Sequence, residues 1–171
     1  SYTVGHQVGM AISLLQSSFN MAWVPWFYRQ LEQNDDVIKQ KIVKFTYLYN
    51  VLLLIAVFAL TACAPLIFSL FIAASYADSI QYVFWIALGF AFDGMYKMVA
   101  NYIFFVHKTY WISVITMGVA VLNIALTYGM ISWYGAIGAA QATAICFLIE
   151  FLVVWIASQR LYRMPWFSLK F

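Results

Sequence analysis

Charged and amide side chains that interrupt long apolar stretches are the residues of this chain best placed to do chemistry. Asp93 and Lys97 lie four residues apart near the middle of one such stretch, and Asn101 follows four residues later. This spacing places all three on one face of a helix. Two interpretations are open: an ion pair that neutralises itself and merely packs, or the charged wall of a substrate cavity.

A second polar pair, Gln16 and Asn20, has the same spacing nearer the amino terminus. Together with Ser13 and Ser17 it gives the first apolar stretch a polar face. Small polar side chains in lipid-embedded helices often hydrogen-bond to a neighbouring helix. We therefore expect Gln16 and Asn20 either to line the same substrate cavity or to form a polar seam between helices.

A lone carboxyl, Glu150, lies near the middle of the last apolar stretch, seven residues after Thr143 and almost on the same helical face. Asn123 and Thr127, four residues apart, lie in the preceding stretch. A charge inside a bilayer costs about 2.5–3.5 kcal/mol on insertion scales. Glu150 is thus either a protonated packing residue or part of an ion-coupling site, to which Asn123, Thr127 and Thr143 would contribute.

The sequence contains no pattern typical of catalysis or of a metal centre. Ser/His/Asp and Cys/His clusters, the HExxH motif and phosphate-binding loops are absent. Cys63 and Cys146 lie in separate apolar stretches without metal-ligand spacing, which indicates packing residues. We therefore expect a protein that is not an enzyme, that needs no cofactor and that has no firm metal site.

The elements that carry these residues follow from the composition. Of the 171 residues, 65% are hydrophobic and only 9% are charged, whereas a soluble domain has about 25% charged residues. This excludes a soluble enzyme and a nucleic-acid-binding module. Since a membrane-spanning helix needs about 20 mostly apolar residues, we predict an all-α integral membrane protein. Its five spans are expected at about 4–28, 45–73, 80–106, 110–132 and 135–159, with Pro65 kinking or ending the regular part of the second.

The basic residues predict the orientation of these spans. Eight of the nine Lys and Arg residues follow spans one, three and five: Arg29, Lys39, Lys41, Lys44, Lys108, Arg160, Arg163 and Lys170. The positive-inside rule then places the amino-terminal end outside and the carboxyl terminus in the cytoplasm. Residues 29–44 would be a cytoplasmic connector, either simply solvated or forming an interfacial helix on anionic lipids that starts at Asn34–Asp36.

Three runs of the sequence resemble the polysaccharide and O-antigen (Wzx-like) flippases of the multidrug/oligosaccharidyl-lipid/polysaccharide (MOP) exporter superfamily. They are YTVGHQVGMAISLLQSSFNMAWVPWFYRQL, FWIALGFAFDGMYKMVANYIFFVHKT and LNIALTYGMISWYGAIGAAQATAICFLIEFLVVW. The most specific parts are WVPWFY at 23–28 and YGAIGAAQAT at 134–143. The resemblance covers nearly the whole chain.

This resemblance implies two six-helix lobes around a central cavity, as in MATE-like transporters. The chain would supply helices eight to twelve, most of the second lobe, and we expect it to be a piece of a longer protein that contains the first lobe. The complete protein would lie in the plasma (inner) membrane. There it would flip undecaprenyl-pyrophosphate-linked oligosaccharide to the outer leaflet by alternating access, driven by H⁺ or Na⁺.

The related lipid II flippases hold a sodium ion in the second lobe, and the Asn and Thr of that site match Asn123 and Thr143. The Asp that follows the Asn by one turn is replaced here by Thr127, which departs from the sodium pattern. Glu150 would then supply a titrating carboxylate instead. Two other functions are open: a multidrug or small-molecule exporter of the same superfamily, and a non-catalytic membrane scaffold in which Asp93, Lys97 and Glu150 are replaceable.

Overall fold

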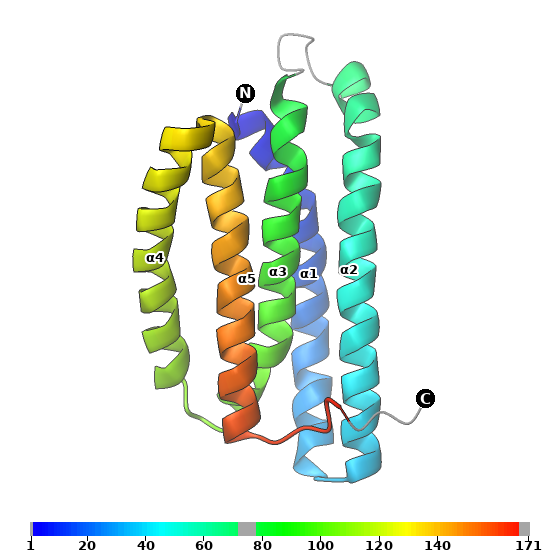
Figure 1. The fold of residues 1–171 in the computed structure, drawn as a ribbon. Helices are drawn as coiled ribbons and strands as arrows, with labels where there is room; N and C mark the ends of the chain where they lie inside the picture. Colours follow the sequence, from blue (N-terminus) through cyan, green and yellow to red (C-terminus); the bar gives the residue numbers. More distant parts are fainter. Residues whose placement is uncertain (1, 72–77, 168–171) are drawn as a thin grey trace.

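A computed structural model of the chain describes residues 2–71 and 78–167, and all the regular secondary structure within these ranges is helical. Five helices follow one another as an up-and-down bundle (Figure 1): α1 Tyr2–Glu32, α2 Asp36–Phe71, α3 Ile80–Phe105, α4 Tyr110–Tyr134 and α5 Ala136–Leu161. The all-α class predicted from the sequence is therefore confirmed.

Four of these helices, α2 to α5, are long and apolar enough to cross a membrane. This property indicates a multi-pass membrane protein. Helix α1 has 31 residues and is about 46 Å long at 1.5 Å per residue, which exceeds the thickness of a bilayer core. Because α1 carries the polar face described above, its hydropathy is lower, and its membrane crossing stays a prediction.

The expected connector at 29–44 is almost entirely helical. Helix α1 continues to Glu32 and α2 begins at Asp36, so the non-helical link is Gln33 to Asp35. Asn34 adopts φ 48° there, a left-handed conformation that Asn tolerates better than most residues. The Asp35 carboxylate accepts a hydrogen bond from the backbone N–H of Val37 at 2.8 Å. The predicted helix start is therefore present, but it opens a 36-residue helix and not a separate interfacial one.

Helix α2 continues through Pro65 to Phe71, so this proline does not end the helix. Proline is tolerated in membrane helices because neighbouring groups satisfy the carbonyl that it leaves without a donor. The predicted end of this span, at residue 73, lies outside the described residues.

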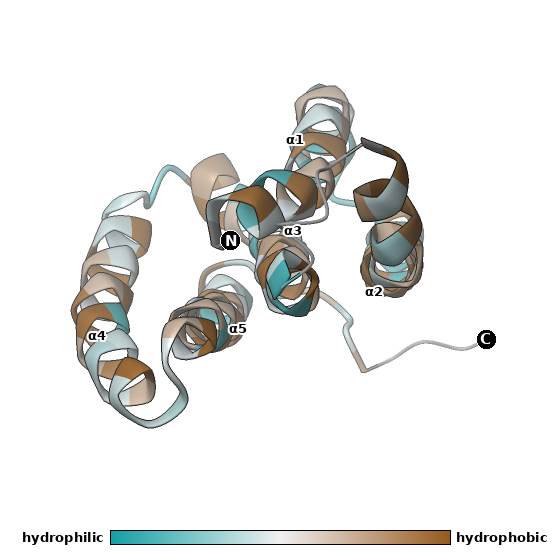
Figure 2. Ribbon diagram, turned by 90° about the horizontal axis from the view of Figure 1, so that it is seen from above, coloured by the Kyte–Doolittle hydropathy of each residue, from teal (hydrophilic) through white to brown (hydrophobic). Residues whose placement is uncertain are grey.

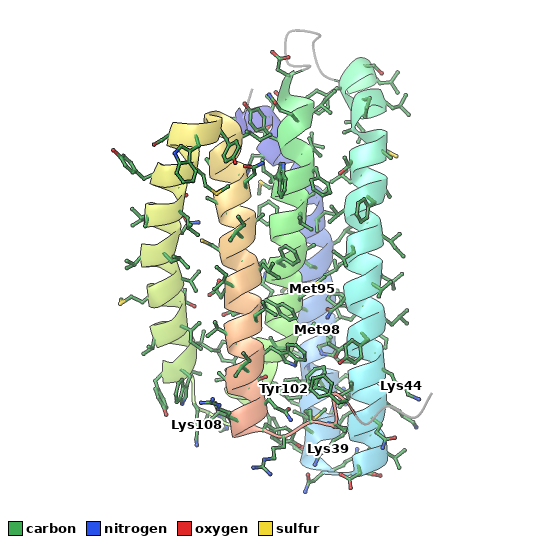
Figure 3. All side chains as sticks on the ribbon, viewed as in Figure 1. Lys39, Lys44, Met95, Met98, Tyr102 and Lys108 are labelled. Atoms are coloured by element: carbon green, nitrogen blue, oxygen red, sulfur yellow. The ribbon has the colours of Figure 1, made fainter. Side chains whose placement is uncertain are left out.

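Helix α3 lies at the centre of the bundle and packs against α1, α2 and α5, as the view from above shows (Figure 2). Its buried side chains include Met95, Met98 and Tyr102, which are labelled in Figure 3. Helix α4 packs on α5 and barely touches α3, and none of its residues is buried. The helix with the most polar centre is thus the one most enclosed by protein.

The basic residues of the loops and helix ends gather at one end of the bundle, as Lys39, Lys44 and Lys108 illustrate (Figure 3). Lys170 lies outside the described residues. At this end the segment 162–167 crosses beneath the helices, with Trp166 buried against aromatic rings of α2, α3 and α5. The Tyr47 hydroxyl donates a hydrogen bond to the Trp166 carbonyl at 3.1 Å. That this end faces the cytoplasm stays a prediction.

Candidate functional site

The two predicted polar faces of α1 and α3 meet inside the bundle. Lys97 Nζ lies 2.9 Å from Asp93 Oδ2, which makes an ion pair along one face of α3. Gln16 bridges this pair from α1: its amide donates to Asp93 Oδ2 at 2.7 Å, and its oxygen accepts from Lys97 Nζ at 3.0 Å. Lys97 also reaches Ser17 Oγ at 3.4 Å.

One turn further along, Asn101 Nδ2 donates to Asn20 Oδ1 at 2.9 Å. All five residues predicted for the substrate cavity are therefore brought together, along with Ser17, which the sequence placed on the same polar face as Gln16 and Asn20. We call this set the α1–α3 polar cluster: Gln16, Ser17, Asn20, Asp93, Lys97 and Asn101.

The cluster has a buried part and a partly exposed part. Gln16 is 1% exposed and Asn101 5% exposed, so these two amides form a polar seam between helices. The side chains of Asp93 and Lys97 are 20% and 29% exposed. One face of the ion pair is therefore partly exposed at the surface of the bundle, while the other face is held by the amide of Gln16.

Glycines allow the close approach of α1 to α3 that these hydrogen bonds require. A Cβ added at Gly9 would lie 2.7 Å from Cγ2 of Ile86, and one added at Gly94 would lie 3.0 Å from Cβ of Gln16. Gly5 lies against the start of α3, with a Cβ that would approach the carbonyl oxygen of Ser79, the residue before the helix, to 2.7 Å. Gly5 and Gly9 form a GxxxG motif, which is typical of tightly packed membrane helices.

A second polar region is a groove of about 440 Å³ between α4 and α5. We call it the α4–α5 groove; its lining includes Thr116, Asn123, Thr143, Cys146, Phe147 and Glu150. Three of the four residues predicted for ion coupling therefore line one space. The fourth, Thr127, does not line it, and its buried hydroxyl has no hydrogen-bond partner among the described residues.

Thr116 is the functional candidate in this groove that the sequence prediction missed. Its hydroxyl donates to Glu150 Oε1 at 2.7 Å, which gives the 7% exposed Glu150 a neutral hydrogen-bond donor. Thr116 precedes Asn123 by seven residues, so both lie on nearly the same face of α4. That spacing was the available signal. The Thr143 hydroxyl donates to the Ala139 carbonyl at 3.0 Å and offers its lone pairs to the groove.

The groove supplies one carboxylate and several neutral oxygen atoms, a donor set suited to a proton or to a hard cation such as Na⁺. Among residues 2–71 and 78–167, no three His, Cys, Asp or Glu side chains gather as a metal site would require. Both cysteines are free, Cys63 at the surface and Cys146 buried beside the groove.

Comparisons of the chain with protein-family models, curated proteins and solved structures give no match. The function of the chain therefore has to follow from the chemistry of the α1–α3 polar cluster and of the α4–α5 groove. The first combines paired charges with amides, and the second combines a single carboxylate with neutral oxygens.

Proposed function

We propose that this chain is part of a secondary transporter that moves a lipid-linked oligosaccharide across the plasma membrane by alternating access. The observation that carries the proposal is a partly exposed ion pair, Asp93–Lys97, within an apolar helix bundle, together with Glu150 in a nearby groove. Ionisable groups inside membrane helices are costly, and they commonly mark the pathway of a substrate or ion.

The substrate class comes from the flippase-like sequence runs, and the site chemistry is compatible with it. An undecaprenyl-pyrophosphate-linked glycan presents anionic phosphates and many hydroxyl groups. Lys97 is the cation of the α1–α3 polar cluster that would meet a phosphate, whereas Asp93 and Gln16 would hydrogen-bond to hydroxyl groups. In the proposed transporter, a first lobe of the same protein supplies the opposite wall of the cavity and further positive charge.

The α4–α5 groove would bind the coupling ion. A charged Glu150 pays a desolvation cost that Thr116, Asn123 and Thr143 offset only with neutral dipoles. We propose that Glu150 is the group that binds the coupling proton or monovalent cation. The ion drives transport only if its affinity differs between the inward- and outward-facing states.

The proposal is tested with Glu150→Gln in the full-length protein, reconstituted into liposomes with a lipid-linked oligosaccharide. Gln preserves the volume and neutrality of the protonated side chain, so we expect normal insertion. A tenfold ion gradient supplies about 1.4 kcal/mol per ion, enough for a tenfold shift in the transport equilibrium. We expect wild type to show this response to a proton or sodium gradient and the variant to lose it, together with most of its flipping rate.

The matched control is Glu32→Gln, which removes an exposed carboxyl at the end of α1 and should leave both quantities unchanged. If Glu150→Gln keeps its rate and its gradient response, Glu150 is a packing residue and the coupling role is refuted. Retained flipping after apolar replacement of Asp93 and Lys97 would refute their role in the substrate cavity and favour a scaffold.

A further inference from the structure

Two apolar grooves flank the last turn of α5, at the end of the bundle where the basic residues gather. The first, the Trp111 groove, lies between α4 and α5 and has a volume of about 190 Å³. The second, the Trp166 groove, lies between α5 and segment 162–167 and has a volume of about 300 Å³. Both linings include Ile156 and Arg160 of α5, so these two residues separate the grooves. The first groove is also lined by Trp111, Val153 and Ala157, and the second by Trp155, Trp166 and Phe167.

The Trp166 groove is held open by contacts that fix segment 162–167 beside α5. The Gln159 amide donates to the Met164 carbonyl at 3.1 Å, and its oxygen accepts from the Met164 backbone N–H at 3.0 Å. Trp166 is buried beneath the helices. The polar atoms of Gln159 are thus engaged with the backbone, and the side chains left to face the groove are mostly apolar.

Arg160 is the charged residue that the two grooves share. Its side chain is exposed and makes no hydrogen bond or ion pair with any described residue. Neither lining contains an Asp or Glu among the residues that the structure describes. A guanidinium group presents five N–H donors in a fixed fork, which suits bidentate hydrogen bonds to a phosphate. The shared cation therefore complements an anionic phosphate.

The direction of the grooves matches the profile of a bilayer. Arg160 lies in the last turn of α5, and the end of a membrane-spanning helix lies at the level of the lipid head groups. Val153 precedes it by seven residues, which is about 10 Å along the helix axis toward the middle of the membrane. Trp111 and Trp155 line the grooves at the level where tryptophan is enriched in membrane proteins. Each groove thus extends from the head-group level into the hydrocarbon layer.

We propose that the two grooves bind one anionic phospholipid with two acyl chains. Its phosphate binds Arg160, one chain begins in the Trp111 groove, and the other begins in the Trp166 groove. A lipid with a single chain would fill one groove and leave the other without an occupant, so two grooves on either side of one cation favour a two-chain lipid. The inference requires that the bundle span a membrane, but it does not require transport.

Such a lipid would hold two weakly attached parts of the bundle against α5. Helix α4 packs on α5 and barely touches any other helix, and a chain in the Trp111 groove contacts both helices. A chain in the Trp166 groove contacts α5 and the segment that carries Trp166. The bound phospholipid is therefore expected to be a structural ligand of this end of the bundle.

The test is native mass spectrometry of the full-length protein in a neutral detergent, titrated with phosphatidylglycerol or with phosphatidylcholine of the same two acyl chains. We expect one phosphatidylglycerol adduct that is about tenfold tighter than the phosphatidylcholine adduct, because the charged hydrogen bonds to Arg160 are not offset by a choline group. Arg160→Gln should bind the two lipids equally. Lysophosphatidylglycerol, which keeps the phosphate but has one chain, should bind wild type more weakly, and inorganic phosphate should not displace the two-chain lipid.

Arg29→Gln is the matched control, because Arg29 is an exposed arginine in the last turn of α1 and lines neither groove. It should keep the preference of wild type for phosphatidylglycerol. If Arg29→Gln loses this preference as fully as Arg160→Gln, the attraction comes from the general positive charge and the inference is wrong. Equal binding of both phospholipids to wild type, equal binding of the one-chain and two-chain lipids, or displacement by inorganic phosphate would each overturn it as well.

Discussion

Replacing Gln16 with Leu is the most direct test of the α1–α3 polar cluster. Gln16 is almost completely buried and makes two interhelical hydrogen bonds, one to each member of the Asp93–Lys97 pair. Leu has a similar volume but can make neither bond. The substitution therefore removes the polar bridge while it leaves the ion pair within α3 in place.

The magnitude follows from the number of bonds lost. Interhelical hydrogen bonds in membrane proteins contribute about 0.6 kcal/mol on average and up to about 1.7 kcal/mol each, so two bonds predict a loss of about 1–3 kcal/mol. Each bond connects the Gln16 amide to a charged side chain, Asp93 or Lys97, and so we expect a loss in the upper half of that range. The free energy of unfolding, measured by reversible denaturation of the full-length protein in mixed micelles, is the quantity to compare.

Gln7→Leu provides the matched control, since Gln7 lies on the same helix but is exposed. It receives the same chemical change without losing an interhelical bond, and we expect its stability to stay within about 0.5 kcal/mol of wild type. If Gln16→Leu is as stable as Gln7→Leu, the amide bridge does not hold α1 to α3, and the packing of the polar cluster described above is wrong.

Two further substitutions test the packing of the bundle by the same unfolding measurement. Gly9→Ala should lower the free energy of unfolding by about 1–3 kcal/mol, because its Cβ would lie 2.7 Å from Cγ2 of Ile86. Gly118→Ala is the control, because a Cβ there meets open space, and it should not destabilise the bundle. Equal stabilities of the two variants would contradict close packing at Gly9. Trp166→Ala should cost about 3–5 kcal/mol because it empties an aromatic pocket beneath the bundle. Phe167→Ala, at a 90% exposed site, should leave the free energy of unfolding nearly unchanged. If Trp166→Ala changes it as little, segment 162–167 does not pack against the helix bundle.

Sequence spacing predicted which polar residues share a helix face, and the structure brings them together in two groups. Intervals of four and seven are enough for this, because they fix the angle around a helix axis. Spacing does not identify the neighbouring helix, and so Thr116 was missed although its hydroxyl donates a hydrogen bond to Glu150. The Gly5–Gly9 motif is a sequence signal for close helix packing, separate from the spacing of the polar residues, and in the structure these glycines lie against the start of α3.

The positions of the helices relative to one another were less predictable. Both α4 and α5 are apolar nearly all round, and lipid tails are as apolar as a protein core, so hydropathy does not distinguish a buried face from a lipid-facing one. Composition therefore gave no sign that α4 would have no buried residue while α3 lies at the centre. For the connector at 29–44 the sequence left a solvated segment and an interfacial helix open; in the structure α1 and α2 extend through most of it, because each helix continues beyond its apolar part.

Helix α4 is attached to the rest of the bundle almost entirely through α5, and this affects the α4–α5 groove. Gly135, with φ 66°, is the single residue between α4 and α5, and apart from α5 the other helices barely contact α4. A rotation of about 5° there would displace Thr116, about 28 Å away at 1.5 Å per residue, by about 2.5 Å. Such a displacement is enough to break the 2.7 Å hydrogen bond from Thr116 to Glu150. A small rotation of α4 about Gly135 would therefore widen the groove at Glu150 and separate α4 from α5, without changing how α1, α2, α3 and α5 pack against one another.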